Sequence, residues 1–85
     1  MSSTNRSPED APTIARVVGV KESLITVDTT GLGLKKNEVG YIRVGEERLK
    51  SEVLRIQSGV ADMQVFEATK GVRVGDQVEM SGEML

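Results

Sequence analysis

Cysteine and histidine are absent from the 85 residues of this chain, and the only aromatic side chains are one Tyr and one Phe. Without Cys or His there is no disulfide, no zinc site of the usual ligand types, no thiol nucleophile and no histidine base. Two rings are too few for the stacking platforms that bind single-stranded nucleic acid. Apolar runs are far shorter than the roughly 18 residues of a membrane-spanning helix. These absences argue against most enzyme classes and predict a cytoplasmic protein without direct membrane contact.

Charge of either sign is not concentrated anywhere in the sequence. There are 11 Lys and Arg against 13 Asp and Glu, a formal net charge of −2. Because the cations are dispersed through an acidic-leaning chain, no electrostatic footprint for nucleic acid is visible. The length allows one domain, which buries only about 60% of the surface that its unfolded chain exposes.

The chain divides into two segments of different composition. Residues 1–12, MSSTNRSPEDAP, hold Ser, Pro, Asn and acids with hardly an apolar side chain. Ordering such a segment costs backbone entropy and buries little in return, which predicts a flexible N-terminal tail. Residues 13–85 are predicted to form the folded domain.

From residue 13 onward, short runs of Val, Ile, Leu and Thr end at Gly, Ser, Asn or Asp within four to ten residues. This pattern is typical of strands joined by turns, and no window has the apolar stripe of a helix. The pattern predicts an all-β fold, a small six-stranded antiparallel barrel. The expected strands are 14–20, 24–28, 39–44, 48–57, 60–66 and 77–81.

Three glycine-containing turns are expected between these strands, because Gly supplies the positive φ of tight hairpins. They are Gly45-Glu46-Glu47, Ser58-Gly59 and Gly75-Asp76. A two-residue loop at Ser58-Gly59 would bring Leu54 and Ile56 back against Ala61 and Met63.

The strand 48–57 changes its apolar phase along its length. Leu49 and Val53 share one face, whereas Leu54 and Ile56 fall on the other. Regular alternation cannot produce this change, so we predict a bulge or bend near Val53. Bends of this kind help a small sheet curl into a barrel.

The core is expected to hold mainly Val, Ile and Leu, with Phe66 and Tyr41 as its large rings. On this view Phe66→Ala would leave a cavity and cost about 3–5 kcal/mol. The segment Gly31-Leu32-Gly33-Leu34-Lys35-Lys36-Asn37 is too rich in glycine for a strand and is predicted to be a surface loop, anchored by Leu32 and Leu34.

Several short motifs are candidates for a functional site. Gly31-Leu32-Gly33 lacks the following Gly-Lys-Ser or Gly-Lys-Thr, the helix and the spacing of a phosphate-binding loop. The acid pairs Glu9-Asp10 and Glu46-Glu47 fall in the tail and on a hairpin tip, where carboxylates stay solvated. The cations Lys35-Lys36, Lys70 and Arg73 are scattered and are interpreted as ordinary surface charge. No catalytic, cofactor-binding or metal-binding residue is therefore assigned.

The segment QVFEATKGVRVGDQVEMSG, residues 64–82, strongly resembles the end of the N-terminal barrel of the catalytic A subunit of V-type and archaeal-type ATPases. The segments 44–49 and 52–56 look like paired strands of the same family, and 16–20 with 24–25 fit its first hairpin. The resemblance covers about residues 13–85. Departures are Glu22-Ser23 where the family commonly has Gly-Pro, Ala15 where Gly is frequent, and Gln77 where Pro often follows the Asp.

This resemblance implies a barrel domain of a longer ATP synthase subunit. In that family the nucleotide and magnesium residues lie beyond the barrel, so no cofactor is expected here and Mg-ATP belongs to the parent subunit. Six barrels, three from A and three from B subunits, form a crown that holds the head together during ATP-coupled transport of protons or sodium. The alternatives are a stand-alone OB-like barrel that binds a ligand and, with less support, a small enzyme.

Overall fold

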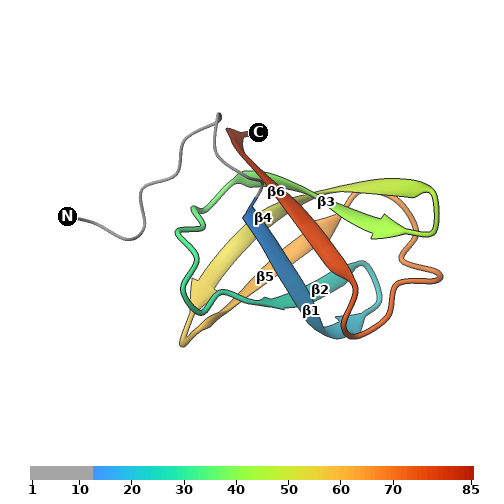
Figure 1. The fold of residues 1–85 in the computed structure, drawn as a ribbon, viewed down its shortest axis with the longest axis horizontal. Coiled ribbons are helices and arrows are strands. Elements are labelled where there is room, and N and C mark those ends of the chain that lie inside the picture. Colours follow the sequence, from blue (N-terminus) through green and yellow to red (C-terminus); the bar gives the residue numbers. More distant parts are fainter. Residues whose placement is uncertain (1–12) are drawn as a thin grey trace.

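The computed structural model describes residues 13–85, which form strands and loops without a helix in that range (Figure 1). The predicted tail, residues 1–12, lies outside the described residues. The six strands are β1 (Thr13–Lys21), β2 (Leu24–Asp28), β3 (Glu38–Val44), β4 (Glu47–Gln57), β5 (Val60–Val65) and β6 (Gln77–Met84).

The strands close into a barrel in the order β1-β2-β5-β4-β3-β6, and every neighbouring pair is antiparallel. Strand β6 closes it by pairing with β1 on one side and with β3 on the other, and Figure 1 shows it crossing the front of the barrel. Closure removes the unpaired edges that promote aggregation of open sheets. The predicted all-β, six-stranded antiparallel barrel is confirmed.

Predicted and observed strand ends differ by at most three residues, and the largest difference is at β6. The sequence predicted an end at Ser81, but the strand continues to Met84, which pairs with Glu38 of β3. Gly82, at φ 78°, lies inside this extension. The irregular pairing between Glu38 and Gly40 accommodates the extra residues, a feature that alternation alone does not reveal.

The hairpin turns use positive φ as expected. Ser58 and Gly59 have φ of 56° and 83°, the sign that a type I′ turn requires at both central residues. The β3–β4 turn contains only Gly45 and Glu46, so Glu47 belongs to β4. The third predicted turn, at Gly75-Asp76, leads the chain into β6, where an Asp76 carboxylate oxygen accepts a hydrogen bond from the Arg73 amide at 2.8 Å.

The predicted bulge in the fourth strand is confirmed. The β4–β5 register shifts between Val53 and Arg55, which leaves Leu54 without a partner. Val53 is therefore fully buried opposite Met63, and Ile56 lies opposite Ala61 as expected. Met63 faces Val53 and not Leu54, because the bulge adds one residue between Val53 and Ile56.

The barrel interior contains aliphatic and methionine side chains and no ring. Its members are Ala15, Val17, Ile25, Val27, Ile42, Leu49, Val53, Ala61, Met63, Val65, Val78 and Met80. The prediction that Phe66 fills the core is wrong: Val65 occupies the inward position at the end of β5, so Phe66 turns outward and remains 46% exposed. Tyr41 is also outside, half-buried beneath the Arg48 guanidinium.

Methionine fills the volume that we had assigned to rings, and Gly40 makes room for it. A Cβ at Gly40 would lie 2.8 Å from Met80 Sδ, a separation that real Cβ atoms essentially never show, and 3.1 Å from Met63 Cε, which is tighter than most real Cβ contacts. Both thioethers are buried, so they have little space to move away. Flexible Met side chains suit such an irregular gap.

Gly40→Ala is therefore expected to lower the free energy of unfolding by about 1–2 kcal/mol, since overpacking outweighs the gain from replacing a strand glycine. Gly19→Ala is the matched control, because its Cβ would meet Thr26 only at 3.7 Å. Urea unfolding of both variants measures the difference. Equal stabilities would show that the methionines adapt without cost.

Candidate functional site

The glycine-rich segment after β2 is a connecting loop, as predicted. Leu32 and Leu34 pack against the core, and the Leu32 amide donates to the Thr29 carbonyl at 2.9 Å. The loop runs into β3, not into a helix. A phosphate-binding loop needs backbone amides that converge at a helix N-terminus, and this geometry is not present between residues 29 and 38.

The charged motifs weighed from the sequence do not come together. Glu46 and Glu47 are exposed at the β3–β4 turn, and Glu9-Asp10 lies outside the described residues. The Lys35-Lys36 pair belongs to the β2–β3 loop, whereas Lys70 and Arg73 belong to the loop between β5 and β6. Within residues 13–85 there is no group of three or more Asp or Glu side chains able to hold a metal ion.

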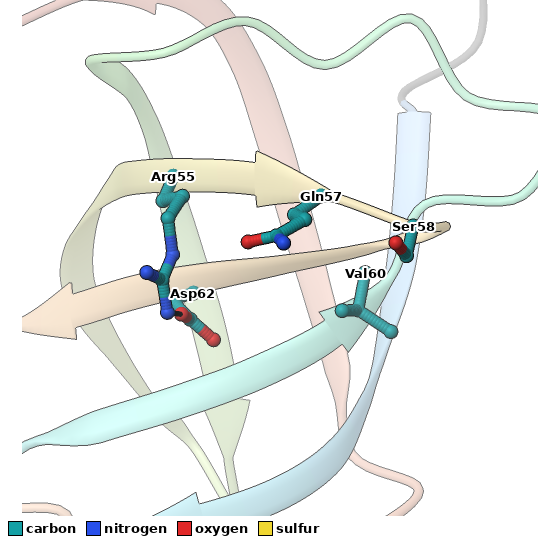
Figure 2. Close-up of a pocket in the computed structure, with 5 residues that line it drawn as sticks. All are labelled: Arg55, Gln57, Ser58, Val60 and Asp62. Carbon is teal, nitrogen blue, oxygen red and sulfur yellow. Dashed lines mark hydrogen bonds and ion pairs between the residues drawn. The ribbon is translucent and has the colours of Figure 1, made fainter.

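A hollow of about 250 Å³ lies beside the β4–β5 hairpin, lined by Arg55, Gln57, Ser58, Val60 and Asp62 (Figure 2). Arg55 Nη2 bonds Asp62 Oδ2 at 2.8 Å across the two strands, and Asp62 Oδ1 accepts from the Thr26 hydroxyl at 3.2 Å. These side chains satisfy one another. The hollow is open to solvent, and its only ion pair is the one between Arg55 and Asp62. We therefore interpret it as a shallow surface groove beside the hairpin and not as a binding site.

A more distinctive surface covers the outer wall over β3, β4 and β6. We call it the cationic face; its residues are Tyr41, Arg43, Arg48, Lys50, Phe66 and Glu79. Cross-strand pairing places Tyr41 beside Lys50 and also beside Glu79, and Arg43 beside Arg48. The Phe66 amide donates to the Lys50 carbonyl at 3.0 Å, which places Phe66 beside Lys50 at the end of the β4–β5 pairing.

Glu79 organises the two arginines of this face. One of its carboxylate oxygens accepts from Arg43 Nη1 and the other from Arg48 Nη2, both at 3.0 Å. The Arg48 guanidinium carbon also lies 4.6 Å from the centre of the Tyr41 ring, a cation–π contact. One carboxylate and one ring thus hold two exposed guanidinium groups side by side.

The cationic face was not predicted from the sequence, because its members are far apart in the chain. The available signal was the alternation of polar with apolar residues in β3 and β4, which sends Tyr41, Arg43, Arg48 and Lys50 to one face. Their approach to Glu79 depends on the β3–β6 pairing across more than thirty residues. No local pattern specifies that pairing.

Glu38 is a second feature that the sequence did not reveal, a fully buried carboxylate at the start of β3. Its oxygens accept from the Lys35 amide at 3.0 Å and from the Gly82 amide at 2.9 Å. A buried carboxylate is tolerated when it is hydrogen-bonded in this way. The side chain joins the β2–β3 loop to the C-terminal part of β6.

Asp28 shows the only resolved pKa displacement among the described residues. Hydrogen bonds from the Thr30 amide and then from its hydroxyl hold the pKa of Asp28 below its ordinary 3.8, against a smaller opposing effect of desolvation. The ionised side chain therefore favours the fold above pH 3.8, and this contribution is lost as the pH falls through the lowered pKa. The contact stabilises the turn after β2 and has no catalytic geometry.

A closed barrel of six short antiparallel strands with a side-chain-filled interior is a small β-barrel domain. Residues 13–82 match the model of the ATP synthase alpha/beta family, beta-barrel domain. The match extends from β1 into β6, and the chain belongs to this family.

Individual relatives agree with the family match. The chain is 52% identical over 73 residues to the V-type ATP synthase alpha chain of Treponema denticola, covering 86% of this chain. It is 45% identical over 69 residues to V-type ATP synthase alpha chain 1 of Treponema pallidum, and 43% over 70 residues to the alpha chain of Borrelia turicatae, covering 81% and 82% of this chain. In each case the chain spans 12% of the relative's length. The resemblance to the A-subunit barrel is thereby confirmed.

Between residues 13 and 85 the structure has no helix of the length and apolar character needed to cross a bilayer.

Proposed function

We propose that this chain is the N-terminal barrel of a V-type ATP synthase catalytic subunit and holds the head of the enzyme together. The observation that carries the proposal is the family match across the barrel, with 52% identity to an alpha chain of which this chain spans 12%. In the proposed head, three such barrels alternate with three from the partner subunit. Mg-ATP binds elsewhere in the parent subunit, at the cytoplasmic side of the membrane, and its turnover is coupled to transport of protons or sodium.

The barrel suits a mechanical role because it is closed and tightly packed. Every strand pairs on both sides, and the interior is filled by twelve buried side chains. A close-packed interior has low compressibility and transmits strain. A ring of such barrels resists radial spreading while the catalytic domains below it open and close.

The test is a chimera in which residues 13–85 replace the corresponding barrel of the Treponema denticola V-type ATP synthase alpha chain. We expect this chimeric subunit to assemble with its partner subunits in the same stoichiometry as the parental subunit, measured by native mass spectrometry. A matched chimera with a Gly-Ser linker in place of the barrel is expected to remain unassembled.

Two outcomes contradict the proposal. One is efficient assembly of the linker chimera, which would mean that the barrel does not hold the head together. The other is that the barrel chimera does not assemble under conditions in which the parental subunit does.

A further inference from the structure

We propose that the cationic face is the surface on which a neighbouring barrel docks, and that this neighbour presents carboxylate side chains set among apolar ones. This inference rests on the proposed assembly function and names the part of the barrel wall that carries it. Its residues are those defined above, Tyr41, Arg43, Arg48, Lys50, Phe66 and Glu79.

The local charge of the cationic face favours an acidic partner surface. The cationic face contains three cations, Arg43, Arg48 and Lys50, and one carboxylate, Glu79, in a chain whose formal net charge is −2. The Glu79 carboxylate is shared between both arginines and leaves Lys50 without an ion pair among residues 13–85. Excess positive charge on one wall favours a partner surface of the opposite sign.

The two arginines of the cationic face are preorganised for binding. The side chains of Arg43 and Arg48 remain 49% and 55% exposed although both are bonded to Glu79. Each guanidinium carries five N–H donors, so most donors are free to bind carboxylates of a partner. Because Glu79 and the Tyr41 ring already orient these groups, binding loses less side-chain entropy than it would with free arginines.

Two aromatic residues accompany the charges of the cationic face. The two aromatic residues flank Lys50: the exposed Phe66 is bonded to it through the backbone, and the half-buried Tyr41 pairs with it across β3 and β4. Protein interfaces are enriched in Tyr, Phe and Arg relative to the remaining surface. Phe66 therefore supplies an apolar contact residue among the charged residues of the cationic face.

The position of the face and the chemistry of the whole chain favour a protein partner. The face lies on the side wall of the barrel, formed by β3, β4 and β6. In the proposed head the barrels stand side by side, so a side wall is available to a neighbouring barrel. A nucleic acid is opposed by the net negative charge, because its binding depends on neutralising many phosphates.

The experiment measures subunit association in the chimeric head, with three substitutions made in residues 13–85. Arg48→Glu reverses charge at the centre of the cationic face, and Phe66→Ala removes the exposed ring without opening the core. Arg55→Glu is the matched control, since Arg55 is also an exposed, ion-paired arginine of β4 but lies beyond the bulge at the hollow. Thermal unfolding of each chimera identifies any variant that fails to fold.

We expect Arg48→Glu and Phe66→Ala each to raise the dissociation constant of the chimeric subunit for its partner at least about tenfold. Arg55→Glu should change this dissociation constant by less than about threefold. Added salt should weaken binding by the unsubstituted parental chimera more than it weakens binding by the Arg48→Glu chimera. If the parental chimera assembles and the three variants bind alike, the docking face is wrong and the proposed function stands. If the parental chimera does not assemble, the proposed function itself fails.

A binding measurement with DNA distinguishes a protein partner from a nucleic acid. The same chimeras are titrated with a 20-base-pair DNA duplex at 0.15 M salt. No saturable binding is expected; saturable binding that Arg48→Glu abolishes would assign the face to a nucleic acid and overturn the proposal.

Discussion

Replacing Ile42 by Ala is expected to lower the free energy of unfolding by about 2–5 kcal/mol. Ile42 is fully buried on β3, between Leu49 of β4 and Val78 of β6, so truncation removes burial and leaves a cavity where three strands meet. In a domain of this size each kcal/mol corresponds to a shift of about 4–8 °C in melting temperature. Differential scanning calorimetry and urea unfolding of the 85-residue chain measure the loss.

Two control variants show whether the loss comes from burial. Ile56→Ala makes the same chemical change at a side chain that is 41% exposed, and Phe66→Ala removes a larger group that is also outside the core. Both are expected to cost less than about 1 kcal/mol. A loss at Phe66 that matched the loss at Ile42 would mean that the ring is buried in solution, contrary to the structure.

Glu38→Gln is expected to destabilise the barrel by about 1.5–3 kcal/mol. The two carboxylate oxygens accept from two backbone amides, those of Lys35 and Gly82. Glutamine has one acceptor oxygen, so its NH₂ group must face one of these N–H donors and leave that donor unsatisfied. Urea unfolding measures the loss, and faster amide hydrogen exchange at Lys35 or Gly82 identifies the broken contact.

The control is Glu52→Gln. Glu52 Oε2 accepts from the Asn37 side chain at 2.7 Å at an exposed site, and a glutamine oxygen can take over this single bond. We expect a change within about 0.5 kcal/mol. If Glu38→Gln were equally mild, the buried carboxylate would not be needed to hold β6 against the β2–β3 loop.

The elements that the sequence predicted well are those with a local physical cause. The turn at Ser58-Gly59 follows from the positive φ that its residues tolerate, and the bulge at Leu54 follows from the phase change between Val53 and Ile56. Each of these signals lies within a few neighbouring residues. The barrel closure was also predicted, from the number and spacing of the strands together with the family resemblance.

The features that escaped prediction depend on contacts between distant residues. Phe66 was assigned to the core by its size, yet alternation in β5 gives the inward position to Val65. The cationic face likewise exists only because β3 pairs with β6. Glu38 was not singled out in the sequence, since nothing nearby in the chain indicates that the Gly82 amide will bond to it.

The central claim, that the barrel supports assembly and not nucleotide binding, is tested most directly by the nucleotide affinity of the chimeric alpha subunit carrying Ile42→Ala, measured beside its assembled fraction. We predict a Kd for Mg-ATP within about twofold of the unmutated chimera, because a core change in the barrel leaves a separate nucleotide site intact. The fraction of assembled heads should fall together with the stability of the barrel. A Kd that rises tenfold or more while assembly remains complete would contradict the account and place the barrel at the catalytic site.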